Sequence, residues 1–283
     1  MKKSLVAAMV LTAIVAATPC LIAQAQLDVP RVSPKATVSQ VVGFTEVKIL
    51  YCRPGVKGRV IWGDLVPYDQ VWRTGANEAT TITFGEAVTV DGHPLAAGTY
   101  GLFTIPGKDE WTIIFNSGAE QWGAYEYKPE QDVLRIKVKP QKSEYTEWMT
   151  FSFPALSPES AEVALTWDRL KVAFTVKVDV VDKVLAKARE AMADWRTPFR
   201  AAMFCVENNV ALPEAAAWIE KAVAINPSYY PMYGKARILW ATGKKADAIA
   251  TMEKAIELGK AAEPKADTAP GERFLAEWEK GKK

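Results

Sequence analysis

Cysteine and histidine are scarce in this chain of 283 residues, which contains three cysteines and one histidine. Only Cys52 and Cys205 lie beyond residue 25, too few for a disulfide framework. The single histidine, His93, excludes the multi-histidine zinc patterns, and HExxH, CxxC and GxSxG motifs are missing too. The sequence therefore predicts no metal site, no cofactor and no catalytic residue.

An excess of charge and long apolar runs are also lacking beyond the first 25 residues. Residues 1–25 carry two of the 35 basic residues and none of the 33 acidic ones, so 33 of each sign remain. A balanced charge argues against nucleic-acid binding, which needs a basic face. No later segment has the length and apolarity of a transmembrane helix.

The first 25 residues have the pattern of a secretory signal peptide. Lys2 and Lys3 precede an apolar run, which ends in the small-x-small sequence Ala23-Gln24-Ala25. Cys20 would permit a lipid anchor, but Pro19 precedes it where a small residue is wanted. We expect cleavage after Ala25 and a protein that is periplasmic or secreted, without a membrane span after cleavage.

Residues 32–181 are predicted to form a β-rich domain. β-Branched and aromatic residues alternate with polar ones, and turn-forming residues separate the runs at 91–98, 106–110 and 153–160. Short strands without intervening helices predict an antiparallel β-sandwich or barrel-like domain. The expected strands are 36–42, 46–52, 79–84, 87–90, 99–105, 111–116, 133–139, 147–153, 162–167 and 171–178.

Residues 183–283 are predicted to form an all-α domain with tetratricopeptide-like repeats. The segments EAAAWIEKAVAINP (214–227) and DAIATMEKAIELGK (247–260) place similar residues 33 positions apart. A period near 34 residues with small residues at these offsets is typical of stacked helical hairpins. The array is either a bundle that stabilises the end of the chain or a surface that docks a protein partner.

A polar and aromatic segment after the second expected strand is the candidate functional region. Arginine forks beside aromatic rings can hold a carboxylate or a sugar ring. In the structural alternative, Arg73 or Arg53 pairs with Glu78 inside the sandwich while tryptophans fill the core. Gly75 is expected to relieve the backbone of a tight loop. The candidate ligand-binding residues are Arg53, Lys57, Arg59, Trp72, Arg73, Asn77 and Glu78, with Trp122 and Tyr125 in a second aromatic stretch.

The run "RPGVKGR…LVPY…VWRTGANEAT", followed by "GTYGLFTIPGKDEWTIIFNS" and "QWGAYEY", resembles an exported bacterial family called domain of unknown function 2911. The resemblance covers about Val32 to Val178. It implies a secreted or periplasmic β-rich domain, sometimes followed by tetratricopeptide-like helices. It implies no activity and therefore assigns no catalytic residue.

Two hypotheses about function follow. In the favoured one, the protein is a non-catalytic envelope protein whose β domain binds a glycan, a carboxylate or a peptide. The alternative is a metal-independent hydrolase of envelope glycan or peptide that uses Glu78 with Arg73, Asn77 and Tyr68. Burial discriminates between a ligand site and a structural lock, because a site needs Arg73 and Glu78 to line a cleft, whereas a lock needs them paired.

Overall fold

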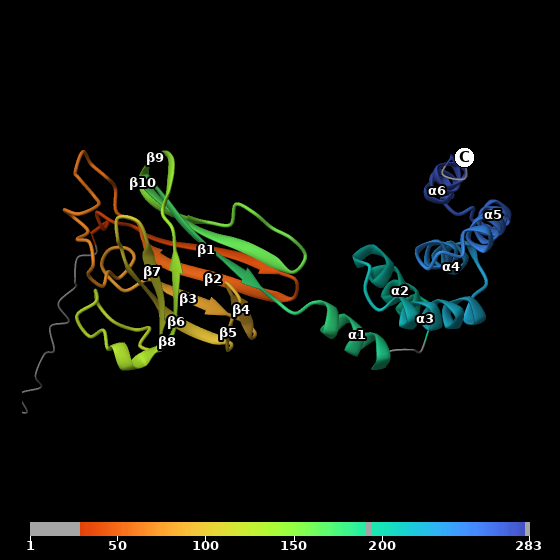
Figure 1. Ribbon diagram of the computed structural model, residues 1–283, viewed down its shortest axis with the longest axis horizontal. Helices are drawn as coiled ribbons and strands as arrows, with labels where there is room; N and C mark the ends of the chain where they lie inside the picture. The colour runs from red at the N-terminus through yellow and green to blue at the C-terminus, as the bar shows by residue number, and fades with distance from the viewer. Residues whose placement is uncertain (1–28, 191–193, 281–283) are drawn as a thin grey trace, which may run out of the picture.

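The computed structural model describes residues 29–190 and 194–280 (Figure 1). The predicted signal peptide lies outside the described residues. Two antiparallel sheets are followed by six α-helices, which confirms the predicted order of a β domain and a helical domain. No helix in residues 29–190 or 194–280 is long and apolar enough to span a bilayer.

The β domain consists of a six-stranded and a four-stranded sheet. The first has the order β1-β2-β3-β6-β7-β8, and the second the order β5-β4-β10-β9. The first sheet contains β1 (Lys35–Val42), β2 (Thr45–Cys52), β3 (Thr81–Phe84), β6 (Gly98–Ile105), β7 (Trp111–Asn116) and β8 (Asp132–Val138). The second contains β4 (Val88–Val90), β5 (His93–Leu95), β9 (Gln141–Ser152) and β10 (Ser160–Lys177).

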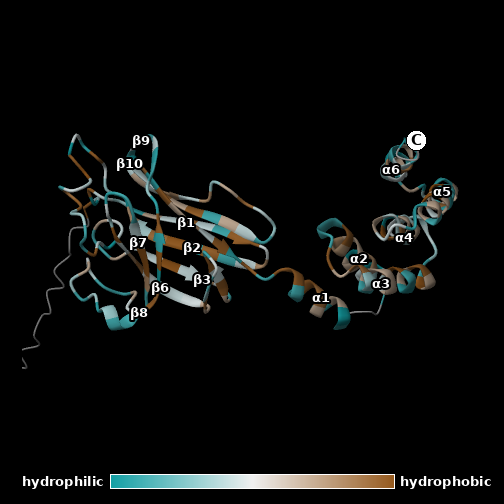
Figure 2. Ribbon diagram, in the orientation of Figure 1, coloured by the Kyte–Doolittle hydropathy of each residue, from teal (hydrophilic) through white to brown (hydrophobic). Residues whose placement is uncertain are grey.

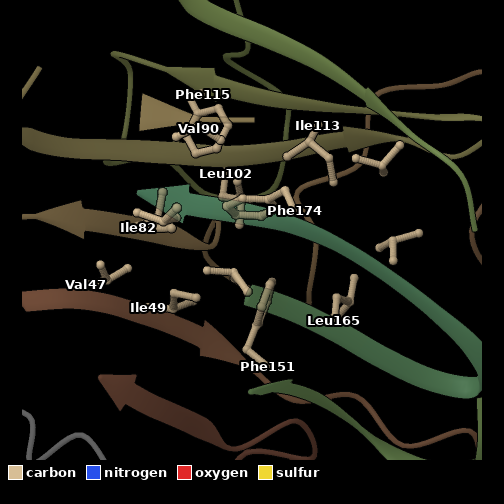
Figure 3. Close-up of a cluster of buried hydrophobic side chains, with 14 of the residues drawn as sticks. Val47, Ile49, Ile82, Val90, Leu102, Ile113, Phe115, Phe151, Leu165 and Phe174 are labelled. Atoms are coloured by element: carbon tan, nitrogen blue, oxygen red, sulfur yellow. The ribbon is translucent and has the colours of Figure 1, made fainter. Parts of the chain in front are cut away.

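The core lies between the two sheets. Alternation along β2 buries Val47, Ile49 and Tyr51 and leaves Glu46 and Lys48 exposed. Figure 3 shows Val47 and Ile49 in one cluster with Phe151 and other residues from the four-stranded sheet. The central strands accordingly carry the hydrophobic colour in Figure 2. Burying one such side chain contributes about 1.5–3 kcal/mol, so the alternating pattern decides which face of each strand is inside.

Two predicted details of the strands are wrong. The expected strands 162–167 and 171–178 are one strand, β10, because pairing with β9 continues through a register irregularity at Asp168. The expected turn at 91–98 contains a strand, β5. Asp91 and Gly92 both have positive φ and form a two-residue hairpin loop that returns the chain onto β4.

Six helices form the second half of the chain. They are α1 (Val181–Glu190), α2 (Arg196–Asn208), α3 (Leu212–Ile225), α4 (Tyr229–Ala241), α5 (Lys245–Ala261) and α6 (Ala269–Lys280). Helices α2 and α3 pack together, as do α4 and α5. The alanines that recur 33 residues apart, Ala215 with Ala248 and Ala222 with Ala255, are all fully buried. Their small side chains let neighbouring helices approach closely.

Helix α1 connects the two halves and contributes to both cores. Val184 packs against the sandwich core, whereas Leu185 and Ala188 belong to the core of the helices. Lys183 also forms an ion pair with Glu86, which lies between β3 and β4. Figure 1 shows α1 between the sandwich and the remaining helices.

Candidate functional site

A cleft of about 350 Å³ lies beside the long segment that connects β2 to β3. Figure 1 shows this segment, in orange, at the end of the sandwich remote from α1. The lining comes from residues 32–33, from residues between 54 and 77, and from Trp167 of β10. Five of the nine predicted ligand-binding residues line it, namely Lys57, Arg59, Trp72, Arg73 and Asn77.

Hydrogen bonds to both sheets hold the cleft segment in place. Trp72 exchanges two backbone hydrogen bonds of 2.7 and 2.9 Å with Thr104 of β6. Arg53 donates from Nε to the Met149 carbonyl at 2.9 Å and from Nη2 to Thr150 Oγ1 at 2.6 Å, both in β9. Arg53 does not line the cleft. Its guanidinium instead ties the cleft segment to β9.

The tight loop at residues 74–77 is not shaped as the sequence predicts. Positive φ angles occur at Thr74 and Asn77, whereas Gly75 has none. A Cβ atom on Gly75 would lie 3.0 Å from Thr80 Oγ1 and 3.2 Å from the Cys52 carbonyl oxygen. Glycine is therefore favoured here by the close approach of neighbouring groups. The predicted role in relieving the backbone is wrong.

A cluster of four tryptophans lies beside the cleft, and two of them line it. Trp62, Trp72, Trp111 and Trp167 are neighbours with ring centroids 4.9–6.5 Å apart. Trp72 and Trp167 line the cleft, and their planes are nearly parallel, at 18°. The Trp72 indole donates to the Gly75 carbonyl at 3.1 Å. The indole N–H groups of the other three are buried and have no partner in the described part of the chain.

Positive charge dominates the lining. Lys57, Arg59 and Arg73 line the cleft, and no carboxylate is among the lining residues. Arg59 donates to the carbonyls of Val56 and Gly55, 3.1 and 2.6 Å away. Glu147 stands outside the lining. A hydrogen bond from Tyr145 lowers its pKa, with further contributions from the Lys57 backbone N–H and the charges of Lys57 and Arg59. Glu147 therefore partly balances those two cations.

Arg73 has no such partner. It forms no ion pair within residues 29–190 and 194–280, and its Nε atom is buried without a hydrogen-bond partner. Burial lowers the pKa of its guanidinium because the charged form is desolvated. Arg73 is half-buried, and a partly desolvated cation without a counter-ion is unfavourable, so this group is suited to accept an anion from outside.

Glu78 pairs with a residue that was not among the predicted ones. Arg31 Nη1 donates to both Glu78 carboxylate oxygens at 2.7 and 2.8 Å, and Lys35 Nζ lies 3.5 Å away. Hydrogen bonding from Arg31 lowers the pKa of Glu78 to about 2. The hypothesis that Arg73 or Arg53 pairs with Glu78 is wrong. No sequence signal connects Arg31 and Glu78, which are 47 residues apart.

The second aromatic stretch lies next to this loop. The Gly123 N–H donates to the Asn77 carbonyl at 2.9 Å, and the Ala79 N–H donates to the Gln121 carbonyl at 2.9 Å. Trp122 and Tyr125 are 56% and 85% exposed. Neither lines the cleft, but both are exposed on the loop beside it. Exposed aromatics of this kind are suited to glycan or peptide contact.

A larger hollow of about 720 Å³ lies over the outer surface of the six-stranded sheet. Its lining includes Thr81, Thr83 and Thr99, and it contains no aromatic residue. Two of these hydroxyls already bond to each other, Thr83 to Thr99 at 2.9 Å. No unpartnered buried polar atom belongs to its lining residues. The smaller cleft is therefore the better candidate site.

Sequence reasoning missed Arg31, Trp62 and Trp167. The two tryptophans are remote from each other in the sequence, and only the fold brings both beside Trp72. Within the described residues, no three histidine, cysteine, aspartate or glutamate side chains form a group that could hold a metal ion.

Comparison with known proteins gives one match. A family model described as Protein of unknown function (DUF2911) matches residues 33–176, half of the chain. A search of curated proteins finds no match.

Proposed function

The chain belongs to the DUF2911 family of proteins of unknown function, and we propose that it is a non-catalytic binding protein of the bacterial cell envelope. The β domain binds a glycan, carboxylate or peptide ligand in the tryptophan-lined cleft. The signal-peptide pattern of residues 1–25 supports export to the periplasm or beyond.

One observation carries this proposal. Arg73 lines the cleft with a buried and unpartnered Nε, and no carboxylate is among the lining residues. A structural arginine at such a position would be expected to have a counter-ion. Binding pockets combine apolar walls with a few polar groups that fix the ligand. Arg73 beside Trp72 and Trp167 has this character.

The helices supply a second surface, for a protein partner. Helices α2 and α3, and likewise α4 and α5, form pairs with buried alanines at an offset of 33 residues. Stacked hairpins of this period are typical of tetratricopeptide repeats. We assign the docking of a protein partner to this part of the chain.

The hydrolase alternative finds less support. The charged side chains that line the cleft are Lys57, Arg59 and Arg73, and none of them is a carboxylate. Glu78 is bound by Arg31, and its pKa is about 2. A general acid or base works best with a pKa near the operating pH. Glu78 is therefore poorly suited to that role near neutral pH.

A binding screen tests the proposal. The full chain, Arg73→Ala and Arg169→Ala are applied to arrays of glycans and peptides. Arg169 is an exposed arginine of β10 that does not line the cleft, so it serves as the matched control. We expect the wild type and Arg169→Ala to bind the same ligands and Arg73→Ala to lose them. Binding that survives in Arg73→Ala, or no binding to either array, would contradict the proposal.

A further inference from the structure

The balance of charge around the cleft indicates the charge of its ligand. Three cations line the cleft, but the carboxylate of Glu147 partly compensates the charges of Lys57 and Arg59. Glu147 also accepts a hydrogen bond from the Lys57 backbone N–H at 3.0 Å. Arg59 also bonds to two carbonyls of its own loop. Arg73 is the one lining cation for which the described residues provide no compensating carboxylate. A ligand group with a single negative charge would compensate the charge of Arg73.

One charged donor group in the lining of this cleft has no partner. The guanidinium of Arg73 is half-buried, and its Nε has no hydrogen-bond partner within the described residues. A partly desolvated charged donor favours an oxygen-rich anion that completes its hydrogen bonds. The planar fork of arginine fits a carboxylate, which accepts two parallel hydrogen bonds.

The remaining surface suits a sugar ring. Trp72 lines the cleft, and Trp122 and Tyr125 are exposed on the adjoining loop. The volume of about 350 Å³ is at the low end for ligand pockets, which fits a small unit of a chain better than a large compact ligand.

We infer that the cleft binds a glycan through a sugar that carries one carboxylate, with Arg73 as the residue that binds this group. The exposed aromatics contact neighbouring sugar rings. This inference rests on the proposed function and narrows the ligand to acidic saccharides.

Calorimetric titration of the full chain tests the inference with matched probes. The probes are oligomers of galacturonic and glucuronic acid, their methyl esters, galactose 6-phosphate, and a tripeptide with a free carboxyl end. Esterification removes the charge and keeps the ring, so we expect the esters to bind at least about tenfold more weakly. Arg73→Gln should remove the difference, Arg73→Lys should keep part of it, and Arg169→Gln should leave it unchanged.

A second experiment tests whether the anion binds in the cleft that Trp167 lines. The indole ¹H–¹⁵N signal of Trp167, assigned with Trp167→Phe, should shift with the acid oligomers and stay in place with the esters. Equal binding of acid and ester would overturn the inference while leaving the proposed function intact. Tighter binding of the phosphate or the tripeptide would overturn it as well. If no probe binds and the glycan and peptide arrays are also negative, the proposed function fails with it.

Discussion

Two arginines in the segment between β2 and β3 differ in whether the fold provides them with hydrogen-bond partners. Arg53 uses its guanidinium to hold β9, through Met149 and Thr150. Arg73 lies twenty residues later, half-buried, and its Nε has no partner. The free energy of unfolding of single variants can distinguish the two arginines. A hydrogen-bonded charge stabilises the fold, whereas an uncompensated charge destabilises it.

Replacing each arginine with methionine should therefore have different effects on the free energy of unfolding. Arg53→Met should lose about 1–3 kcal/mol, because hydrogen bonds of a charged group are removed. Arg73→Met should leave stability unchanged or raise it by up to about 1 kcal/mol, because a desolvated charge disappears. Urea titrations with equal m-values measure both. A larger loss for Arg73→Met than for Arg53→Met would show that Arg73 has a structural partner.

The Arg31–Glu78 pair should make stability depend on pH. The folded-state pKa of Glu78, about 2, lies below its ordinary value of 4.5. The ionised carboxylate therefore contributes stability that is fully present above about pH 5 and is lost as the pH falls from 4.5 towards 2. Both side chains are partly exposed, so the contribution should be below about 1 kcal/mol.

Glu78→Gln tests this dependence. The variant should be slightly less stable than the wild type in urea at pH 7, and the difference should shrink at pH 3. A difference that is constant across this range would show that the ionised carboxylate is not what stabilises the fold.

At the scale of elements, the turn between β1 and β2 connects the sandwich to the helical half. Gly43 has a φ angle of +56°, and an added Cβ atom would lie 2.4 Å from Val180, directly before α1. Phe44, next in the turn, lies under the ammonium group of Lys187 at 5.0 Å. The hairpin turn and the start of α1 thus fit together without space for a further methyl group.

Gly43→Ala and Gly92→Ala separate backbone strain from this packing. Both glycines have positive φ, but nothing lies within 4 Å of an added Cβ atom at Gly92. Gly92→Ala should lose about 1–2 kcal/mol through backbone strain alone. Gly43→Ala should lose more, because Val180 and Val178 must also move. Equal losses in thermal unfolding would show that the turn does not pack tightly on residues 178–180.

At the scale of the whole molecule, the chain has separate hydrophobic cores. One fills the sandwich, a small one lies around Phe103 and Ile114 of the six-stranded sheet, and two others lie among the helices. Helix α1 contributes side chains to the sandwich core and to the first helical core. Each half can therefore bury apolar surface of its own, while α1 and Phe204 of α2 contact both the sandwich core and the first helical core.

A chain that ends after Glu190 should keep the β domain folded. It retains Val184 and Lys183, which contact the sandwich. We expect a circular dichroism spectrum of the β type and the same ligand binding as the full chain. The full chain should unfold in two thermal transitions, of which the shorter chain keeps one. A shorter chain that is wholly unfolded would show that both halves form one cooperative unit.

Local chemistry in the sequence was enough to predict the architecture. Period-two alternation selects the inner face of a strand such as β2, and recurring alanines mark the contacts between helices. Both patterns act between near neighbours in the chain, so they can be read without coordinates. The types of residue in the site, an arginine among aromatics, were predicted for the same reason.

The partners of those residues were decided by tertiary structure alone. Arg31 reaches Glu78 across 47 residues, and Trp167 meets Trp72 only because β10 crosses the end of the loop segment. Glu78 is bound by Arg31, whereas Arg73 has no ion-pair partner within the described residues. Which charges are paired and which remain free depends on distances in space that no sequence spacing fixes, since loops of many lengths can bring the same groups together.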